Sequence, residues 1–285
     1  EMRGSLEDYL AGHNEIANPA FDGDFPAIWN ALMVRLSGID GYANEEDGMF
    51  AKAFGAGDFN RFGFEEAATA LAAFEASAFG YGDSPFDEYL KGDNAALTPA
   101  QKRGALLFYG KMQCSQCHSG TLLTDQQHYN IAVPQFGPGK DPASGLDLGR
   151  FAVTDLEEDR FRFRVPGLRN VVRTAPYMHN GAYFSLEDAV KHHLDARSSL
   201  LNYAPEEKLI QDELIGTYID SPAVIAALIE SVDIEKIKKY KEKDLNDLME
   251  FLDSLTIPDF DVRMDLAIPS SVPSGLPIDQ FGDGN

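Results

Sequence analysis

The sequence predicts a mainly α-helical fold with long connecting loops. Apolar residues recur at helical spacing in several segments, and helix-starting signals precede some of these segments. Long stretches rich in proline and glycine separate them. The chain has 285 residues, of which 44% are hydrophobic, so it can bury an ordinary core as one large domain or two small ones.

Helices are expected in four places. Residues 64–79 (FEEAATALAAFEASAF) combine Ala and Glu with apolar residues at helical spacing. Thr98 can cap a helix that has Pro99 in its first position. Ser185 and Asp188 form a capping-box pattern at the start of another. The fourth is predicted by an apolar stripe, interpreted as core packing, that comprises Leu245, Leu248, Met249, Leu252 and Leu255.

The residues that carry chemistry are Cys114, Cys117 and His118, which form a C-x-x-C-H motif with Ser115 and Gln116. Two thiols at this spacing can add to the two vinyl groups of one porphyrin, and the adjacent histidine can then bind the iron. A zinc site would need four ligands, and a thioredoxin-like dithiol would need a βαβ setting without the histidine. The motif therefore predicts covalent haem c and a c-type cytochrome, with a disulfide or redox-active pair as the alternative.

Long irregular segments surround this motif. Residues 119–159 contain several prolines and glycines, and because structureless loops of this length are usually functional, we expect this one to wrap the prosthetic group. Proline and glycine also dominate the chain after Pro258, where no regular structure is expected. A domain boundary is predicted just before Leu97, where the helix leading to the motif begins.

A haem iron that carries electrons usually has a second axial ligand. At about 100° per residue along a helix, His193 returns to the direction of Leu186, whereas His192 points away from that face. His193 is therefore the preferred candidate. Met178, on a loop, is the main alternative because a thioether is a common sixth ligand of haem c. His179, His192 or an open site also remain.

The chain is strongly acidic, with 24 Lys and Arg against 46 Asp and Glu and a formal net charge of -22. This charge repels nucleic acids and anionic membranes and favours a redox partner with a basic docking face, although solubility alone explains it equally well. No stretch has the ~18 apolar residues that span a bilayer. The sequence starts at Glu1 without Met or a signal-like n-region and h-region, which predicts a processed or truncated product. Because haem is normally attached to C-x-x-C-H outside the cytoplasm, a periplasmic or cell-surface location is expected.

Several segments together resemble one family. These are the run from Arg103 to Phe108, the haem motif, LDLGR at 146–150 and, above all, FRVPGLRNVVRTAPYMHNG at 163–181. They are similar to the C-terminal haem domain of bacterial di-haem cytochrome c peroxidases and their MauG-like relatives. The resemblance extends to both flanks, 70–93 and 272–277, so almost the whole chain is covered.

The resemblance implies a domain organisation. Residues 97–262 would form a class I cytochrome c-like helical haem domain with long loops. Residues 1–96 resemble the part of the peroxidase N-terminal domain that follows its haem motif, a helical remnant of a second cytochrome-like domain. Residues 263–285 would form an extended tail. One covalent haem c is expected.

The resemblance also implies ligands. In the family, the distal ligand of the C-terminal haem follows the PYMHNG-like loop, as methionine in many peroxidases and tyrosine in MauG-like proteins. That position falls on His193, which implies a bis-histidine haem with a lower reduction potential than a Met/His haem. A calcium ion is expected at the backbone carbonyls of Thr174 and Pro176.

Arg169 lies in the same family-like segment and is the preferred partner for a haem propionate, because guanidinium groups match carboxylates. Arg160, Arg162 and Arg164 are weaker candidates. Surface charge balance in an acidic protein is the alternative for each of them.

The departures from the family concern peroxide chemistry. A second C-x-x-C-H is absent, and Tyr9 and Phe21 stand where relatives use a glutamine and a glutamate. Neither residue can do carboxylate acid/base work, so no catalytic residue is assigned. The possible substitutes His13, Glu15 and Asp22 are expected to be solvated loop residues. Trp29 is expected in the core.

Two classes of function follow. The first is a periplasmic electron-transfer cytochrome in which His118 and His193 hold the iron. The second is the electron-relay part of a peroxidase or MauG-like oxidase whose peroxide-reacting haem lies on a missing segment or a partner chain. A haem protein with an open iron site for a small ligand is a weaker third class.

Overall fold

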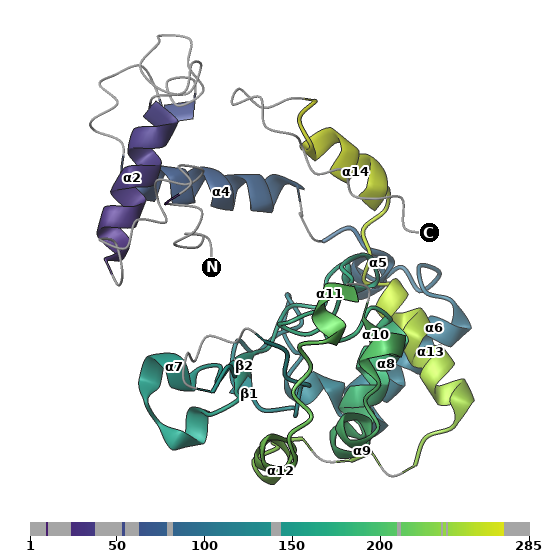
Figure 1. Cartoon of the computed structure of the whole chain (residues 1–285). Coiled ribbons are helices and arrows are strands. Elements are labelled where there is room, and N and C mark those ends of the chain that lie inside the picture. Colours follow the sequence, from purple (N-terminus) through teal and green to yellow (C-terminus); the bar gives the residue numbers. More distant parts are fainter. Residues whose placement is uncertain are drawn as a thin grey trace. The chain divides into compact units, whose positions relative to one another are not determined.

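The computed structural model describes residues 10, 24–37, 53–54, 63–78, 82–137, 144–209, 212–234, 236–237 and 239–270. The chain divides into two compact units, shown in Figure 1. We call Glu1–Gly80 with Asp261–Asn285 the terminal unit, and Tyr81–Phe260 the motif unit, because it contains C-x-x-C-H. Each unit is described by itself.

In the terminal unit, helix α2 (Phe25–Ser37) contacts helix α4 (Phe64–Ala78). The predicted helix at 64–79 is thus confirmed up to Ala78, and Phe79 lies outside the described residues. The indole of Trp29 stacks on Phe64 with ring centres 5.1 Å apart. Its prediction as a core residue is wrong, because its side chain is 41% exposed. Phe25 is a second neighbour, with ring centres 6.3 Å apart, and these contacts bury the indole only in part.

The chain after Pro258 also departs from its prediction. Helix α14 spans Phe260–Ala267, where no regular structure is expected from the sequence. The segment FDVRMDLA contains neither proline nor glycine, and the next proline is Pro269. The irregular composition therefore begins later than Pro258, which leaves room for two helical turns. Residues 271–285 lie outside the described part.

The motif unit is mainly α-helical, which confirms the predicted fold class. Its short strands β1 (His128–Tyr129) and β2 (Phe163–Arg164) pair antiparallel, with Tyr129 opposite Phe163. Its helices are α5 (Pro85–Leu90), α6 (Pro99–Leu106), α7 (Phe151–Thr154), α8 (Leu186–Leu194), α9 (Ala196–Leu201), α10 (Pro205–Lys208), α11 (Asp212–Ile215), α12 (Pro222–Glu230) and α13 (Glu242–Asp253). Within 119–159, the described residues 119–137 and 144–159 contain only short elements, in agreement with the predicted long loop.

The predicted helix starts are confirmed by their hydrogen bonds. Thr98 caps α6, and its side chain and that of Gln101 satisfy each other's backbone N–H groups. Ser185 caps α8 by accepting from the backbone N–H of Asp188. These caps fix where the two helices that flank the haem motif begin.

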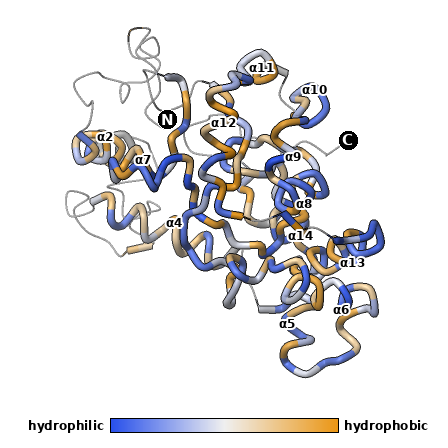
Figure 2. Tube along the Cα trace, turned by 90° about the horizontal axis from the view of Figure 1, so that it is seen from below, coloured by the Kyte–Doolittle hydropathy of each residue, from blue (hydrophilic) through white to orange (hydrophobic). Residues whose placement is uncertain are grey.

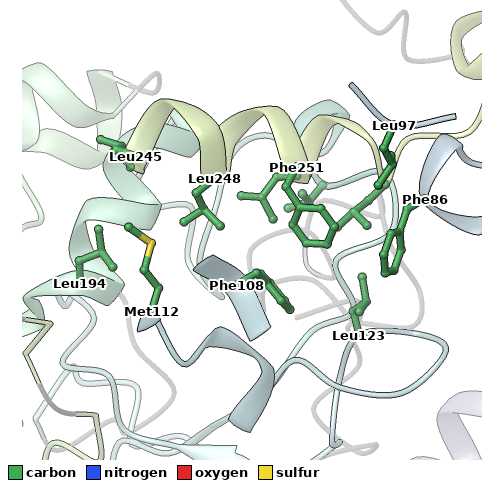
Figure 3. Packing of buried hydrophobic residues seen from close by; sticks show 12 residues of the cluster. Phe86, Leu97, Phe108, Met112, Leu123, Leu194, Leu245, Leu248 and Phe251 are labelled. Carbon is green, nitrogen blue, oxygen red and sulfur yellow. The ribbon is translucent and has the colours of Figure 1, made fainter. Parts of the chain in front are cut away.

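The core of the motif unit lies between α6 and α13. Figure 3 shows Leu245, Leu248 and Phe251 of α13 pointing toward Phe108 and Met112, which follow α6. The predicted stripe is confirmed, since Leu245, Leu248 and Leu252 of α13 are buried, as is Leu255 just after the helix, and Met249 packs against their cluster. In Figure 2, α13 carries both hydrophobic and hydrophilic residues, as expected for a helix with one buried face.

The motif unit begins earlier than the boundary predicted before Leu97. Helix α5 packs into the same core, where Phe86 meets Phe251 edge to face at 5.1 Å. The backbone N–H of Phe86 also donates to Ser254 O. Residues 82–96 therefore pack with the haem motif, because Phe86 supplies an apolar anchor that the glycines and aspartates around it obscure in the sequence.

Candidate haem site

The C-x-x-C-H motif follows α6 and a π-helical turn, Leu107–Lys111, and its first three residues, Cys114–Gln116, form a 3-10 turn. Cys114 and Cys117 are partly buried free thiols, so the structure does not join them as a disulfide. Burial raises the pKa of the Cys114 thiol to about 11 and also raises that of Cys117. Both thiols are therefore neutral near pH 7.

His118 is oriented by a backbone carbonyl. Its Nδ1 lies 3.1 Å from Leu123 O, and because a carbonyl only accepts, Nδ1 carries the proton and Nε2 keeps its lone pair. Burial lowers the pKa of His118 to about 4, so the ring is neutral. A metal-binding histidine is commonly held in this way, with one nitrogen donating to the protein and the other left for the metal.

His193 on α8 faces His118. The two ring centres are 6.3 Å apart. Nδ1 of His193 lies 2.8 Å from Ala189 O, which again leaves Nε2 as the free acceptor, and burial lowers the pKa of this ring as well. Two imidazoles on either side of one metal, each with a ~2 Å metal–nitrogen bond, have centres roughly 6 Å apart. The pair thus fits an iron between them, while the ligand role of His193 stays a prediction.

His192 does not point away from the core, contrary to the prediction. It is fully buried, with its ring bonded to Tyr183 and to the carbonyl of Ile131. A helical wheel with one buried face fails because α8 is covered on two sides. Ala189 belongs to one buried cluster and Leu194 to another. Neither Tyr183 nor Ile131 was singled out from the sequence, which gives no signal for these contacts.

The alternative ligands have other neighbours. Met178 adopts a left-handed backbone conformation with φ 71° and packs against the cluster that contains Val133 and Phe136. The ring of His179 stacks on Phe163, with centres 3.5 Å apart. These contacts give both side chains packing roles in the loop beside the site.

Arg169 is buried against α5 and the loop after the motif. Its guanidinium forms an ion pair with Asp87 at 2.8 Å, with both side chains 9% exposed. It also donates to Ser84 Oγ at 3.2 Å and to Thr121 O at 3.0 Å. The contacts give Arg169 a structural role, and its propionate role stays a prediction. Among the weaker candidates, Arg160 pairs with Glu157, Arg162 with Asp233, and Arg164 donates to Gln126.

The Asp87–Arg169 pair predicts a pH-dependent stability. Burial raises the pKa of Asp87, but hydrogen bonds from Ser84 and Arg169 outweigh it and hold the pKa below its usual value. A carboxyl with a depressed folded-state pKa stabilises the fold above its unfolded pKa of ~3.9 and loses this effect as the pH falls through the folded value.

Asp87→Asn should therefore lower the free energy of unfolding at pH 7. The gap between variant and wild type should close as the pH falls below ~4. Urea unfolding across this range measures it. Asp253→Asn, at an exposed carboxyl on α13, serves as the control. A gap that stays constant with pH would contradict the assignment.

The remaining predictions concern a calcium site at Thr174 and Pro176 and the positions near the N-terminus. Thr174 and Pro176 are exposed, and the hydroxyl of Thr174 donates to Val171 O. No cluster of three or more His, Cys, Asp or Glu that could hold a metal ion occurs among the described residues, and the calcium prediction stays open. Tyr9 and Phe21, the positions compared with the family's acid/base residues, lie outside the described residues. The same holds for the possible substitutes His13, Glu15 and Asp22.

A mainly α unit in which C-x-x-C-H and a second histidine converge defines a c-type haem protein. The resemblance to the bacterial di-haem cytochrome c peroxidases and MauG-like proteins is confirmed. The chain is 44% identical over 131 residues to cytochrome c551 peroxidase of Pseudomonas aeruginosa, covering 45% of this chain and 36% of the relative. It is 34% identical over 165 residues to the methylamine utilization protein MauG of Methylorubrum extorquens, covering 57% and 42%.

A solved structure supports the fold. The diheme peroxidase BthA from Burkholderia thailandensis matches with a TM-score of 0.55 and 23% identity, over 87% of this chain and 64% of that one. No family model matches the chain. The chain spans less than half of the length of the curated relatives it matches. These relationships support a haem protein related to the di-haem cytochrome c peroxidases and MauG, with haem c as its cofactor.

Among the described residues, no helix has the length and the apolar character needed to cross a bilayer. This agrees with the sequence, in which charged residues interrupt every long apolar stretch.

Proposed function

We propose that this chain is a periplasmic c-type cytochrome that transfers electrons through one covalent haem held by His118 and His193. The observation that supports it is the pair of facing imidazoles, 6.3 Å apart, each with Nδ1 engaged by a backbone carbonyl. Both rings are neutral, as iron ligation requires.

The chain's own residues explain why the site would favour electron transfer. When bound, haem supplies a one-electron couple. Cys114 and Cys117 would anchor it, and two strong imidazole ligands, His118 and His193, would hold its iron in a closed site. A closed site would exclude peroxide and oxygen from the metal, which leaves electron transfer as its main reaction. Imidazole in place of a thioether lowers the reduction potential.

The partner would be a redox protein with a basic docking face. The net charge of -22 attracts such a partner over long range and raises its association rate, while it repels nucleic acids. The periplasmic location rests on the haem motif, because its chemistry is normally completed outside the cytoplasm.

An alternative function is supported by the relatives. Cytochrome c551 peroxidase carries peroxidase activity in its name. This chain would then be the electron relay of a peroxidase or MauG-like oxidase, with the peroxide-reacting haem on another segment or a partner chain.

Haem stoichiometry and peroxide reactivity together test the proposal. The purified holoprotein should contain one haem per chain by pyridine haemochrome assay and intact mass, and Cys117→Ala should lose at least one thioether bond. The reduced protein should pass electrons to a small basic cytochrome at a rate that falls as salt is added, since salt screens the attraction over ~10 Å at 0.1 M. Peroxide turnover by the single-haem chain would contradict the proposal.

A further inference from the structure

His192 belongs to a buried chain of hydrogen bonds that links α8 to other segments. Its Nε2 lies 2.7 Å from Ile131 O, and its Nδ1 lies 2.9 Å from the Tyr183 hydroxyl. The same hydroxyl is 2.9 Å from Ser199 Oγ. His192 is 0% exposed and Tyr183 is 1% exposed. Water therefore cannot replace these bonds if one of them is lost.

The direction of each hydrogen bond follows from the groups involved. Ile131 O can only accept, so Nε2 of His192 carries the proton and Nδ1 is an acceptor. The Tyr183 hydroxyl then donates to Nδ1 and accepts from Ser199 Oγ. Every polar atom of the buried pair is satisfied by one arrangement, in which His192 is neutral.

The chain of bonds fixes the rotation of α8. The bond of His193 to Ala189 O lies within α8 and moves with the helix, so it cannot hold the helix in place. His192 instead bonds to Ile131, which follows β1, and to Tyr183, which precedes α8. Adjacent helical residues are about 100° apart, so a rotation that moved His193 from His118 would also break the bonds of His192.

We propose that Tyr183 and His192 are positioning residues that hold the imidazole of His193 opposite His118 for iron ligation. This inference rests on the proposed function, since it needs His193 as the distal ligand. Removing the Tyr183 hydroxyl leaves Nδ1 of His192 buried without a donor. A shift of α8 would relieve the loss of this hydrogen bond, and the same shift would weaken the bond between His193 and the iron.

Competition by added imidazole measures the strength of His193 ligation in the holoprotein. An external imidazole binds the iron only by displacing His193, so its apparent affinity rises as His193 ligation weakens. Tyr183→Phe should raise that affinity about tenfold, the factor that corresponds to one unsatisfied buried polar group. Optical titration of the ferric protein gives the dissociation constant.

Tyr203→Phe is the matched control. Its ring packs against Tyr183 at 5.4 Å, and its hydroxyl donates to Ala182 O, not to His192. This variant also loses a tyrosine hydroxyl, but one that does not bond to His192. Thermal stability should therefore fall, while the affinity for imidazole stays within about twofold of wild type, below the factor for one unsatisfied buried polar group. An equal shift in Tyr203→Phe and Tyr183→Phe would overturn the proposal.

A second pair of variants covers the case in which Tyr183→Phe does not fold. The amide of His192→Gln can donate to Ile131 and accept from Tyr183, as the neutral imidazole does, whereas His192→Leu of similar size can do neither. His192→Gln should stay closer to wild type in imidazole affinity than His192→Leu. The reverse order would overturn the proposal.

The His193→Ala background distinguishes a failure of the proposed bis-histidine site from a failure of the positioning role. There, Tyr183→Phe should no longer change imidazole affinity, because no distal ligand is left to position. If wild type and His193→Ala bind imidazole equally, the bis-histidine site itself fails. If they differ but Tyr183→Phe matches wild type, only the positioning role fails.

Discussion

Replacing His193 with methionine should raise the reduction potential of the haem by on the order of 0.1 V, within the ~0.8 V that axial ligands span. Imidazole is a stronger donor than a thioether and stabilises the oxidised iron more, so Met/His haems have higher potentials than bis-histidine haems. His193 faces His118 from α8, where a methionine can reach the same space. Potentiometric titration of the holoprotein measures the shift.

Met178→Leu is the control for this prediction. Met178 packs against the cluster of Val133 and Phe136, and leucine preserves that packing. The reduction potential should stay unchanged, because the distal ligand stays the same. A shift with Met178→Leu, together with no shift for His193→Met, would identify Met178 as the ligand instead.

Gly104→Ala should destabilise the fold by about 3 kcal/mol or more, through overpacking at the contact between α6 and α13. A Cβ at Gly104 would lie 1.9 Å from Asp247 O and 2.6 Å from Phe251 Cβ. Neither Asp247 O, a backbone atom, nor Phe251 Cβ can move without its helix, so the two helices must separate. The helix propensity gained by alanine, ~1 kcal/mol, is too small to compensate.

Gly216→Ala is the matched control, because a Cβ there meets no atom within 4 Å. Its free energy of unfolding should stay within about 0.5 kcal/mol of wild type. Urea unfolding measures both variants. If Gly104→Ala were as stable as Gly216→Ala, the close packing of α6 on α13 would be wrong.

The sequence predicts helices and their starts well where one residue type decides the outcome. Thr98 and Ser185 cap the helices that they were expected to cap, because a side-chain oxygen beside the first turn acts locally. The stripe on α13 is likewise visible, since a helix with one buried face repeats its apolar residues at regular spacing. Local signals of this kind need no knowledge of the rest of the fold.

Other features of the structure depend on partners distant in the sequence. The helical wheel assumes one buried face, and His192 escapes it because Ile131 covers the second face of α8. Trp29 was expected in a core, but the described contacts bury only part of it. Arg169 pairs with Asp87 across 82 positions. No spacing rule within a short segment can reveal such contacts.

The central claim is a closed haem site with histidine on both sides of the iron. The ferric holoprotein should show a low-spin signal in electron paramagnetic resonance, and the His193→Ala variant should show a high-spin one. The absorption spectrum should lack the methionine-to-iron charge-transfer band at the red end of the visible range. That band in the wild-type protein, or a high-spin signal from it, would contradict the account.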